Sequence, residues 1–178
     1  PRPPGDVLAV LITGGSQGSR RLNQAARESW PLFRSSGLKV RLLHQSGPRE
    51  HAELASEFAA SGLAGEVVPF IQDMPGAFAG ADLVVSRSGA GAVSELAAAA
   101  KPSILVPFPF AADQHQLRNA EALAEAGAAR LVADAEMTGE RFLKEVTALA
   151  SQEGAFERMG RAARSLARPG AAARAADI

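Results

Sequence analysis

Short apolar segments alternate along the chain with longer segments in which apolar residues recur at helical spacing. Runs rich in leucine or β-branched residues predict strands at 7–13, 39–45, 66–70, 82–86, 103–106 and 129–132. Each run is too short for a buried helix. Stretches rich in alanine, glutamate and arginine predict helices near 19–35, 49–62, 91–100, 114–126 and 138–166. Strands and helices that alternate in this way are typical of right-handed βαβ units. The pattern therefore predicts an α/β fold, a doubly wound parallel sheet of the Rossmann-like kind.

The composition narrows the class of protein. The chain has 178 residues, 19 basic and 19 acidic side chains, and no cysteine. This length can bury a core without a disulfide, and the lack of cysteine excludes thiol catalysis and Cys-ligated zinc. Zero formal charge argues against a nucleic-acid binder, which normally carries a basic face. No apolar run approaches the roughly 20 residues of a membrane span, so we expect a cytoplasmic domain.

The two ends of the chain differ from its middle. Residues 1–5 contain three prolines and predict an interdomain linker, because proline-rich stretches act as semi-rigid spacers. Residues 6–166 carry the whole strand and helix pattern and form the predicted domain. In the tail, 167–178, Pro169 and Gly170 break any helix. The residues after this break fit a frayed end or a helix that needs a partner domain. We favour the second and expect half of a larger protein.

The loop after the first predicted strand is rich in glycine. Residues 14–20 have the sequence Gly-Gly-Ser-Gln-Gly-Ser-Arg and open a helix. Backbone N–H groups can approach a ligand closely there, and the helix N-terminus favours an anion. The glycine spacing matches neither a dinucleotide fingerprint nor a Walker A loop. It predicts a cradle for a phosphate or a sugar, with a tight turn that binds nothing as the alternative.

A rival interpretation uses the same residues. Gly14-x-Ser16-x-Gly18 matches the nucleophile elbow of α/β hydrolases, with Asp113 and His115 downstream as partners. Such a serine normally follows several strands, and its oxyanion hole uses the loop of an earlier strand. Here the serine follows the first strand of the chain, which disfavours the hydrolase.

A second loop, 86–95, also joins a predicted strand to a helix. Small residues at 88–92 leave the first N–H groups of the helix bare, which suits a diphosphate without a metal ion. Glu95 follows within about the first turn, where its carboxylate can accept both hydroxyls of a ribose. The alternative is a capping-box glutamate that bonds only backbone N–H groups.

A third loop, after the fifth predicted strand, crowds polar side chains into the first turns of a helix. Asp113, His115, Gln116 and Asn119 lie there, and such side chains can hydrogen-bond sugar hydroxyls. Asp113 has a plainer interpretation as the helix N-cap. His115 has no second histidine near it in sequence, which disfavours a metal site.

A nucleotide sugar is the ligand that suits these loops together. In the fourth loop, 68–74, backbone groups around Ile71 can meet the edge of a base. The chain has no Asp-x-Asp motif, and the nearest sequence is Asp134-Ala135-Glu136. We therefore expect no metal cofactor, with the diphosphate held by backbone amides and helix dipoles. This combination predicts part of a metal-independent, two-domain glycosyltransferase.

The motifs of these loops resemble the C-terminal half of the MurG family. These bacterial enzymes move N-acetylglucosamine (GlcNAc) from UDP-GlcNAc to lipid I, giving lipid II in peptidoglycan synthesis. The matching motifs occur in the family's order: Gly14-Gly15-Ser16-Gln17-Gly18, His44-Gln45-Ser46-Gly47, Phe70-Ile71-x-Asp73-Met74, Ser86-Arg87-Ser88-Gly89-Ala90 with Ser94-Glu95, and His115-Gln116-x-x-Asn119-Ala120. The resemblance implies the donor-binding domain of a GT-B fold, spanning residues 6–166.

The resemblance also implies roles for individual positions. Ser16 would contact the diphosphate or the sugar, and Ile71 would meet uracil through its backbone. Glu95 would take the ribose hydroxyls, Gln116 the sugar hydroxyls, and 90–94 the phosphates. The implied UDP-GlcNAc site comprises Gly15, Ser16, Gln17, Gly18, Ile71, Ser88, Gly89, Ala90, Gly91, Ala92, Val93, Ser94, Glu95, His115, Gln116 and Asn119.

Three positions depart from the family's pattern. Ser19 stands where alanine is common, Ala92 where threonine or leucine is usual, and Ala100 where a glycine often ends the helix. Alanine tolerates a left-handed backbone less well than glycine does, so we expect slight strain at Ala100. None of the three removes an implied ligand contact.

The family's acceptor-binding half, with its proposed catalytic base, is absent from these 178 residues. The implied mechanism is inverting: a base deprotonates the acceptor hydroxyl, which attacks the anomeric carbon as UDP leaves. We therefore expect no catalytic residue here, and a chain that binds UDP-GlcNAc weakly without turning it over. The full-length enzyme would reach lipid I through its N-terminal half, which the tail would rejoin, at the cytoplasmic face of the inner membrane. The alternatives are a subunit of a split GlcNAc transferase and a non-catalytic nucleotide-sugar-binding module.

Overall fold

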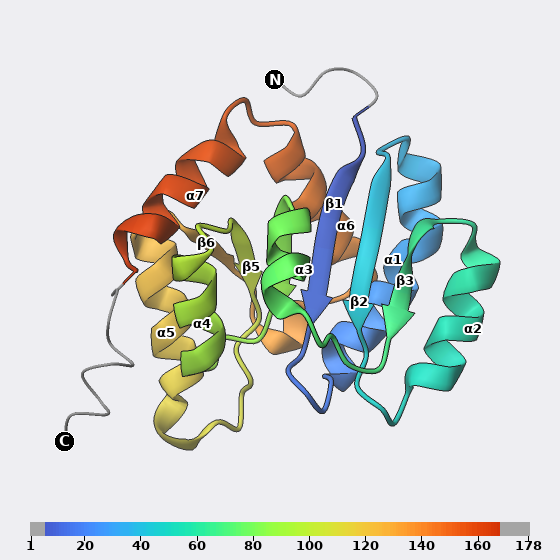
Figure 1. The fold of residues 1–178 in the computed structure, drawn as a ribbon, viewed down its shortest axis with the longest axis horizontal. Helices are drawn as coiled ribbons and strands as arrows, with labels where there is room; N and C mark the ends of the chain where they lie inside the picture. Colours follow the sequence, from blue (N-terminus) through green and yellow to red (C-terminus); the bar gives the residue numbers. More distant parts are fainter. Residues whose placement is uncertain (1–5, 168–178) are drawn as a thin grey trace.

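The computed structural model describes residues 6–167 as one α/β domain (Figure 1). Six parallel strands form a single sheet in the order β3-β2-β1-β4-β5-β6. The strands are β1 (Leu8–Thr13), β2 (Val40–Gln45), β3 (Ala64–Val68), β4 (Leu83–Ser86), β5 (Ser103–Leu105) and β6 (Ala129–Leu131). The predicted doubly wound parallel sheet is confirmed. The expected linker at 1–5 and the tail from residue 168 onwards lie outside the described residues.

Helices connect the strands and cover both faces of the sheet (Figure 1). The α-helices are α1 (Arg20–Ser36), α2 (His51–Ser61), α3 (Met74–Gly80), α4 (Ala90–Ala98), α5 (His115–Glu125), α6 (Gly139–Ala150) and α7 (Ala155–Ser165), and the two 3-10 helices are η1 (Ala112–Gln114) and η2 (Asp134–Glu136). The strand order reverses between β1 and β4, since the chain winds outward from each of them in opposite directions. In such sheets, ligands bind outside the carboxyl ends of the strands at this switch point.

Two apolar layers hold the helices to the sheet, and β1 contributes to both. Val10 and Ile12 face the layer under α1, α2 and α6, whereas Leu11 faces the layer under α3, α4 and α5. A central parallel strand is covered on both faces, which explains why β1 is a nearly continuous apolar run. Phe33 of α1 meets Phe142 of α6 edge to face, with ring centroids 5.7 Å apart. The core therefore fixes α1, and with it the loop that leads from β1.

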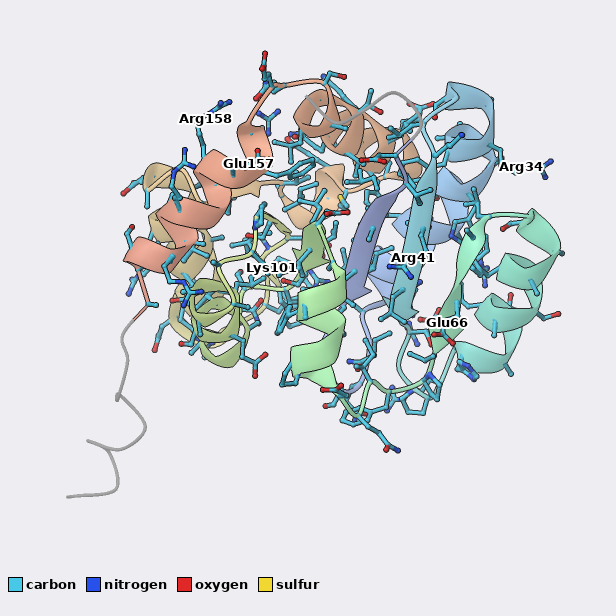
Figure 2. The ribbon with its side chains drawn as sticks, turned by 45° about the horizontal axis from the view of Figure 1, so that its top comes forward. Arg34, Arg41, Glu66, Lys101, Glu157 and Arg158 are labelled. Carbon is cyan, nitrogen blue, oxygen red and sulfur yellow. The ribbon has the colours of Figure 1, made fainter. Side chains whose placement is uncertain are left out.

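One predicted strand boundary is wrong, and it belongs to β3, at the edge of the sheet. β3 spans Ala64–Val68 rather than the expected 66–70. Its first residues are exposed and include Gly65, so they lack the apolar pattern of a buried strand. Arg41 of β2 and Glu66 of β3 lie on the sheet face that α3 leaves uncovered (Figure 2). Polar residues replace apolar ones where the helical cover ends.

The single helix predicted at 138–166 is wrong. The structure has two helices there, α6 and α7, and Gly154 precedes α7 with a φ of 68°. This left-handed residue turns the chain, and α7 then packs against α4 rather than continuing along α1. No proline marks the break, so the helix-forming residues on both sides concealed it.

The end of α4 confirms the strain expected at Ala100. Its φ is 54°, a left-handed conformation that favours glycine. The N–H of Ala100 donates to the carbonyl of Ala97 at 3.1 Å, and that of Lys101 donates to the carbonyl of Leu96 at 3.0 Å. These two bonds form a Schellman motif, in which alanine occupies the position that glycine usually holds.

Ala100→Gly is expected to raise the free energy of unfolding by about 1 kcal/mol. A left-handed backbone costs an L-residue roughly 1–2 kcal/mol, and glycine removes this cost. The greater entropy of glycine in the unfolded state offsets part of the gain. Urea denaturation followed by circular dichroism measures the change. Ala98→Gly is the matched control, since Ala98 is exposed in the last turn of the same helix. In the control, the free energy of unfolding should fall by about 0.5–1 kcal/mol. A loss at both positions would contradict the strain at Ala100.

Candidate functional site

A cavity of about 900 Å³ opens at the carboxyl ends of β1 and β4. It lies at the switch point of the sheet, where this fold class places its ligands. The glycine-rich loop after β1 forms one wall, and the start of α4 forms the opposite wall. Residues 70–72 and the loop after β5 complete the lining. This volume falls within the range of small-molecule sites.

The glycine-rich loop is a tight turn that packs against the loop after β2. The N–H of Gly18 donates to the carbonyl of Gly15 at 3.0 Å, and both glycines have positive φ, 75° and 87°. A Cβ on Gly18 would lie 1.9 Å from the carbonyl oxygen of Ser46, so only glycine fits there. Ser16 and Gln17 are exposed at the tip, and their N–H groups have no partner among the described residues. The turn therefore offers backbone donors beside the N-terminus of α1.

A buried polar network beneath this turn holds the loop after β2. Nε2 of His44 lies 2.9 Å from Oδ1 of Asn23, and Nδ2 of Asn23 donates to the carbonyl of Ser46 at 2.9 Å and to Oε2 of Glu50 at 2.6 Å. Because Oδ1 of Asn23 can only accept, His44 donates through Nε2. Burial lowers the pKa of His44 to about 4, so the imidazole is neutral near pH 7. The network fixes the surface on which Gly18 packs.

The N-terminus of α4 faces the cavity without a side-chain cap. Its N-cap is Gly89, which supplies no capping hydrogen bond, and Gly89, Gly91 and Ala92 line the cavity. Ser86, at the end of β4, lines it too and is only 2% exposed. Its hydroxyl has no hydrogen-bond partner among the described residues. An uncapped helix N-terminus beside an unsatisfied buried hydroxyl is suited to the oxygens of an anionic ligand.

Glu95 lies in the second turn of α4, slightly further along than the sequence suggested, and its side chain lines the cavity. The residue is exposed, and its side chain forms no hydrogen bond or ion pair within the described part of the chain. The capping-box alternative is wrong, because no side chain caps this helix. The Glu95 carboxylate is therefore available to a ligand.

The loop after β5 is fastened to the loop after β4. The hydroxyl of Ser88 donates to the carbonyl of Gln116 at 2.8 Å, and Nδ2 of Asn119 donates to the carbonyl of Ser88 at 2.9 Å. Oε1 of Gln116 accepts from the N–H of Phe108 at 3.0 Å, whereas Nε2 has no partner within residues 6–167. Ser88 and Asn119 thus brace the site, and Gln116 presents two N–H donors to the cavity.

The start of α5 differs from the expected arrangement. Its N-cap is Gln114 rather than Asp113, so the capping interpretation of Asp113 is wrong. Both residues have positive φ, 49° for Asp113 and 53° for Gln114. His115 is exposed, and its Nδ1 contacts the carbonyl of Ala112. The hydroxyl of Ser16 bonds no histidine in the described structure, so the hydrolase alternative lacks its nucleophile and base pair.

The structure gathers most of the predicted site residues around this one cavity. Those in its lining are Gly15, Ser16, Gly18, Ile71, Gly89, Gly91, Ala92, Glu95 and Gln116. The others lie in the same loops and helices but outside the lining: Gln17, Ser88, Ala90, Val93, Ser94, His115 and Asn119. The four loops predicted from the sequence therefore converge at one end of the sheet.

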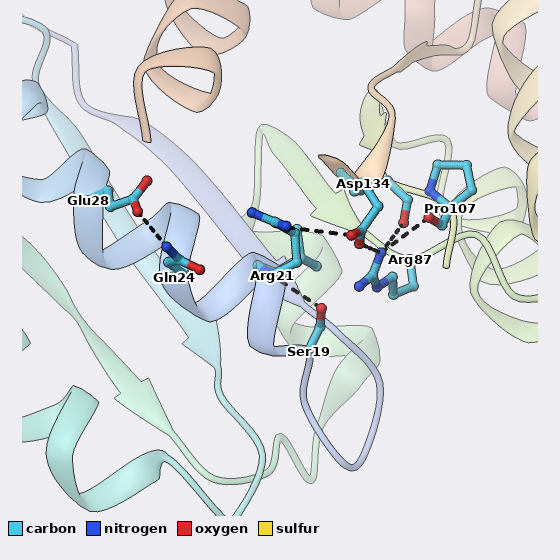
Figure 3. A network of polar contacts seen from close by, with 9 residues as sticks. Ser19, Arg21, Gln24, Glu28, Arg87, Pro107 and Asp134 are labelled. Carbon is cyan, nitrogen blue, oxygen red and sulfur yellow. Dashed lines mark hydrogen bonds and ion pairs between the residues drawn. The ribbon is translucent and has the colours of Figure 1, made fainter. Parts of the chain in front are cut away.

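Sequence reasoning missed a group of charged residues in the cavity wall (Figure 3). Nη1 of Arg87 lies 2.6 Å from Oδ1 of Asp134 and donates to the carbonyls of Val106 and Pro107 at 3.0 and 3.2 Å. Nε of Arg21 lies 3.5 Å from Oδ2 of the same aspartate. Two arginines share one carboxylate, so this wall carries a positive charge although the chain is neutral. The position of Arg87 inside the loop 86–95 was the available signal.

Two kinds of feature are absent from the described residues. No group of three or more His, Cys, Asp or Glu side chains within 6–167 is placed to hold a metal ion. In the same part of the chain, no helix is both long and apolar enough to cross a membrane.

Fold and site together define a Rossmann-like α/β domain with a cavity at the switch point of its sheet, where this fold class places its ligands. The chain belongs to glycosyltransferase family 28, because the profile of the glycosyltransferase family 28 C-terminal domain matches residues 9–175.

Sequence relatives and a solved structure support the assignment to this family. The UDP-N-acetylglucosamine--N-acetylmuramyl-(pentapeptide) pyrophosphoryl-undecaprenol N-acetylglucosamine transferase of Solibacter usitatus is 68% identical over 178 residues, which are 100% of this chain and 48% of that protein. Its namesake from Geotalea uraniireducens is 43% identical over 169 residues, 94% of this chain and 46% of that protein. The crystal structure of Acinetobacter baumannii MurG superposes with a TM-score of 0.86 at 32% identity, covering 97% of this chain and 49% of that one. The chain thus spans about half the length of the curated relatives it matches. The resemblance to the C-terminal half of MurG, and with it a GT-B half, is confirmed.

Proposed function

We propose that this chain is the donor-binding domain of an inverting transferase that moves GlcNAc from UDP-GlcNAc to lipid I. The observation that carries the proposal is the uncapped N-terminus of α4 with the unpaired carboxylate of Glu95 on its next turn, both in the wall of one cavity. Such a pair suits a diphosphate joined to a ribose. The donor and acceptor named for the relatives agree with this chemistry.

The diphosphate would lie between the N-terminus of α4 and the glycine-rich turn. Residues at both places line the same cavity, and so does Ser86, whose buried hydroxyl has no partner among the described residues. Backbone donors and helix dipoles are pre-organised and supply the positive potential that a bound Mg²⁺ supplies in other transferases. The Arg21, Asp134 and Arg87 cluster adds to that potential. We therefore expect donor binding to need no metal ion.

The nucleoside and the sugar would use the remaining walls. The N–H of Ile71 already donates to Oε1 of Gln45 at 2.7 Å, and its carbonyl has no partner in residues 6–167. That carbonyl is the backbone group left to accept the N3–H of uracil. Glu95 would accept the two ribose hydroxyls, and the N–H donors of Gln116 would reach a hydroxyl of the sugar.

In the reaction, this domain would bind the donor and stabilise the leaving group. A base on the other half of the enzyme deprotonates the acceptor hydroxyl, which attacks the anomeric carbon as the bond to UDP breaks. Negative charge then develops on the diphosphate, where the N–H groups of α4 are already aligned to receive it. Such pre-organised electrostatic stabilisation is usually a large part of catalysis. The acceptor is a lipid, so the full-length protein would work at the cytoplasmic face of the inner membrane.

A nucleotide titration series tests the proposal. We expect calorimetry to show UDP binding at least about tenfold more tightly than ADP or GDP, which is about 1.4 kcal/mol of base discrimination. The affinity for UDP should be the same with and without EDTA. Equal affinities for the three nucleotides would reduce the site to general phosphate binding and contradict a uridine donor.

A further inference from the structure

Gln45 stands between two parts of the proposed site. It ends β2, which lies between β1 and β3 in the sheet. The loop after β1 carries the glycine-rich turn, and the segment after β3 carries Ile71, so the phosphate and base contacts come from strands on either side of Gln45. Its side chain is 2% exposed and lines the cavity.

One amide group links the two segments. Nε2 of Gln45 donates to the carbonyl of Gly15 at 2.8 Å and to Oγ1 of Thr13 at 3.2 Å, while Oε1 accepts from the N–H of Ile71 at 2.7 Å. The orientation of the amide follows from its partners, because the Gly15 carbonyl only accepts and the Ile71 N–H only donates. Both amide hydrogens and the oxygen are therefore used inside the protein.

We propose that Gln45 is a positioning residue that sets the spacing and orientation between the glycine-rich turn and the base-binding segment at Ile71. The inference rests on the proposed function, which assigns these two segments to different parts of one nucleotide. Thr13 cannot replace it, since apart from Gln45 its hydroxyl bonds only the turn, through the N–H of Gly15 at 3.3 Å. Without Gln45, each segment keeps its other contacts, including those with Ser46, but loses the direct hydrogen-bonded link to the other segment.

Gln45→Met tests the link in the free protein. Methionine has a similar length and no amide, so it preserves the packing and removes all three hydrogen bonds. By NMR on the labelled 178-residue chain, we expect the Ile71 amide to exchange with solvent at least about tenfold faster, as its acceptor is lost. Backbone resonances should shift in both 14–18 and 70–72. Shifts in only one segment, with unchanged exchange at Ile71, would overturn the proposal.

The affinity for UDP is the second measurement that tests the role of Gln45. Gln45→Met should bind UDP about tenfold more weakly than the parent. Gln152→Met is the matched control, because Gln152 is exposed, lies outside the cavity lining, and its side chain makes no hydrogen bond within residues 6–167. We expect its affinity to change by less than about twofold. Cooperative thermal melting of each variant shows that any loss is not unfolding.

Gln45→Glu provides a conservative rescue. A protonated glutamic acid can donate to the Gly15 carbonyl and accept from the Ile71 N–H, whereas an ionised one cannot donate. Burial raises the pKa of such a carboxyl, so at about pH 5 it should be protonated. At that pH, we expect Gln45→Glu to bind UDP more tightly than Gln45→Met. Equal binding by the two would mean that the hydrogen bonds do not matter.

The two proposals fail in different ways. A parent chain that does not bind UDP contradicts the proposed function, and the exchange at Ile71 then still decides whether Gln45 links the segments. A parent that binds UDP, together with a Gln45→Met variant that binds it equally well, contradicts the role of Gln45 alone.

Discussion

Glu95→Ala is expected to lower the affinity of the chain for UDP by roughly 30- to 150-fold, because a pair of hydrogen bonds that a carboxylate accepts from two hydroxyls is worth about 2–3 kcal/mol. The effect should be on binding and not on folding. Glu95 is exposed and unpaired within the described residues, so its removal leaves no buried group unsatisfied. Calorimetry of parent and variant measures the change, and their melting temperatures should agree.

The ligand itself offers the sharpest control for Glu95. With 2′-deoxy-UDP, one of the two hydroxyls is absent, so Glu95→Ala should cost several-fold less than it does with UDP. Glu121→Ala is the matched protein control, since Glu121 is an exposed glutamate on α5 without a partner within residues 6–167. Its affinity should match the parent. An identical loss for UDP and 2′-deoxy-UDP would move Glu95 away from the ribose.

Gly18→Ala is expected to lower the free energy of unfolding by about 3–5 kcal/mol, through backbone strain and overpacking together. The φ of Gly18 is 75°, and a Cβ would lie 1.9 Å from the carbonyl oxygen of Ser46 and 2.6 Å from its carbon. Both neighbouring atoms are backbone, so neither can rotate away. The turn must shift, and the N–H groups at its tip would shift with it.

Gly15→Ala separates the two causes. Gly15 lies in the same turn with a φ of 87°, yet a Cβ there would have nothing within 4 Å. The Gly15→Ala variant should therefore lose only the part of the free energy of unfolding that comes from backbone strain, about 1–2 kcal/mol. Urea denaturation of both variants gives the comparison. Equal losses would show that packing against Ser46 does not hold the turn.

Much of the fold follows from the sequence because each element carries its own local signal. The run from Leu8 to Thr13 is apolar throughout since helices cover β1 on both faces. Signals weaken where burial ends: the first residues of β3 are exposed, and their composition did not indicate a strand. Gly154 alone did not predict the break between α6 and α7, because a glycine within a helical pattern has several possible causes.

The site residues also differ in how far the sequence could predict them. Glycine-rich loops and a carboxylate near a helix start are local patterns, so the sequence alone pointed to the Gly14–Gly18 turn and to Glu95. Contacts between distant segments carry no such pattern. Asp134 lies 47 residues from Arg87 and Gln45 lies 26 residues from Ile71, and only the sheet order brings each pair together. Such residues position the site, and the fold as a whole determines them.

A crystal structure of the chain with UDP-GlcNAc tests the central claim most directly. We expect the diphosphate within hydrogen-bond distance of the N–H groups that begin α4, both ribose hydroxyls on the carboxylate of Glu95, and uracil against the carbonyl of Ile71. No metal ion should bridge the phosphates. A nucleotide bound away from this cavity, or a ribose turned from Glu95 with the phosphates on a metal ion, would contradict the proposed donor site.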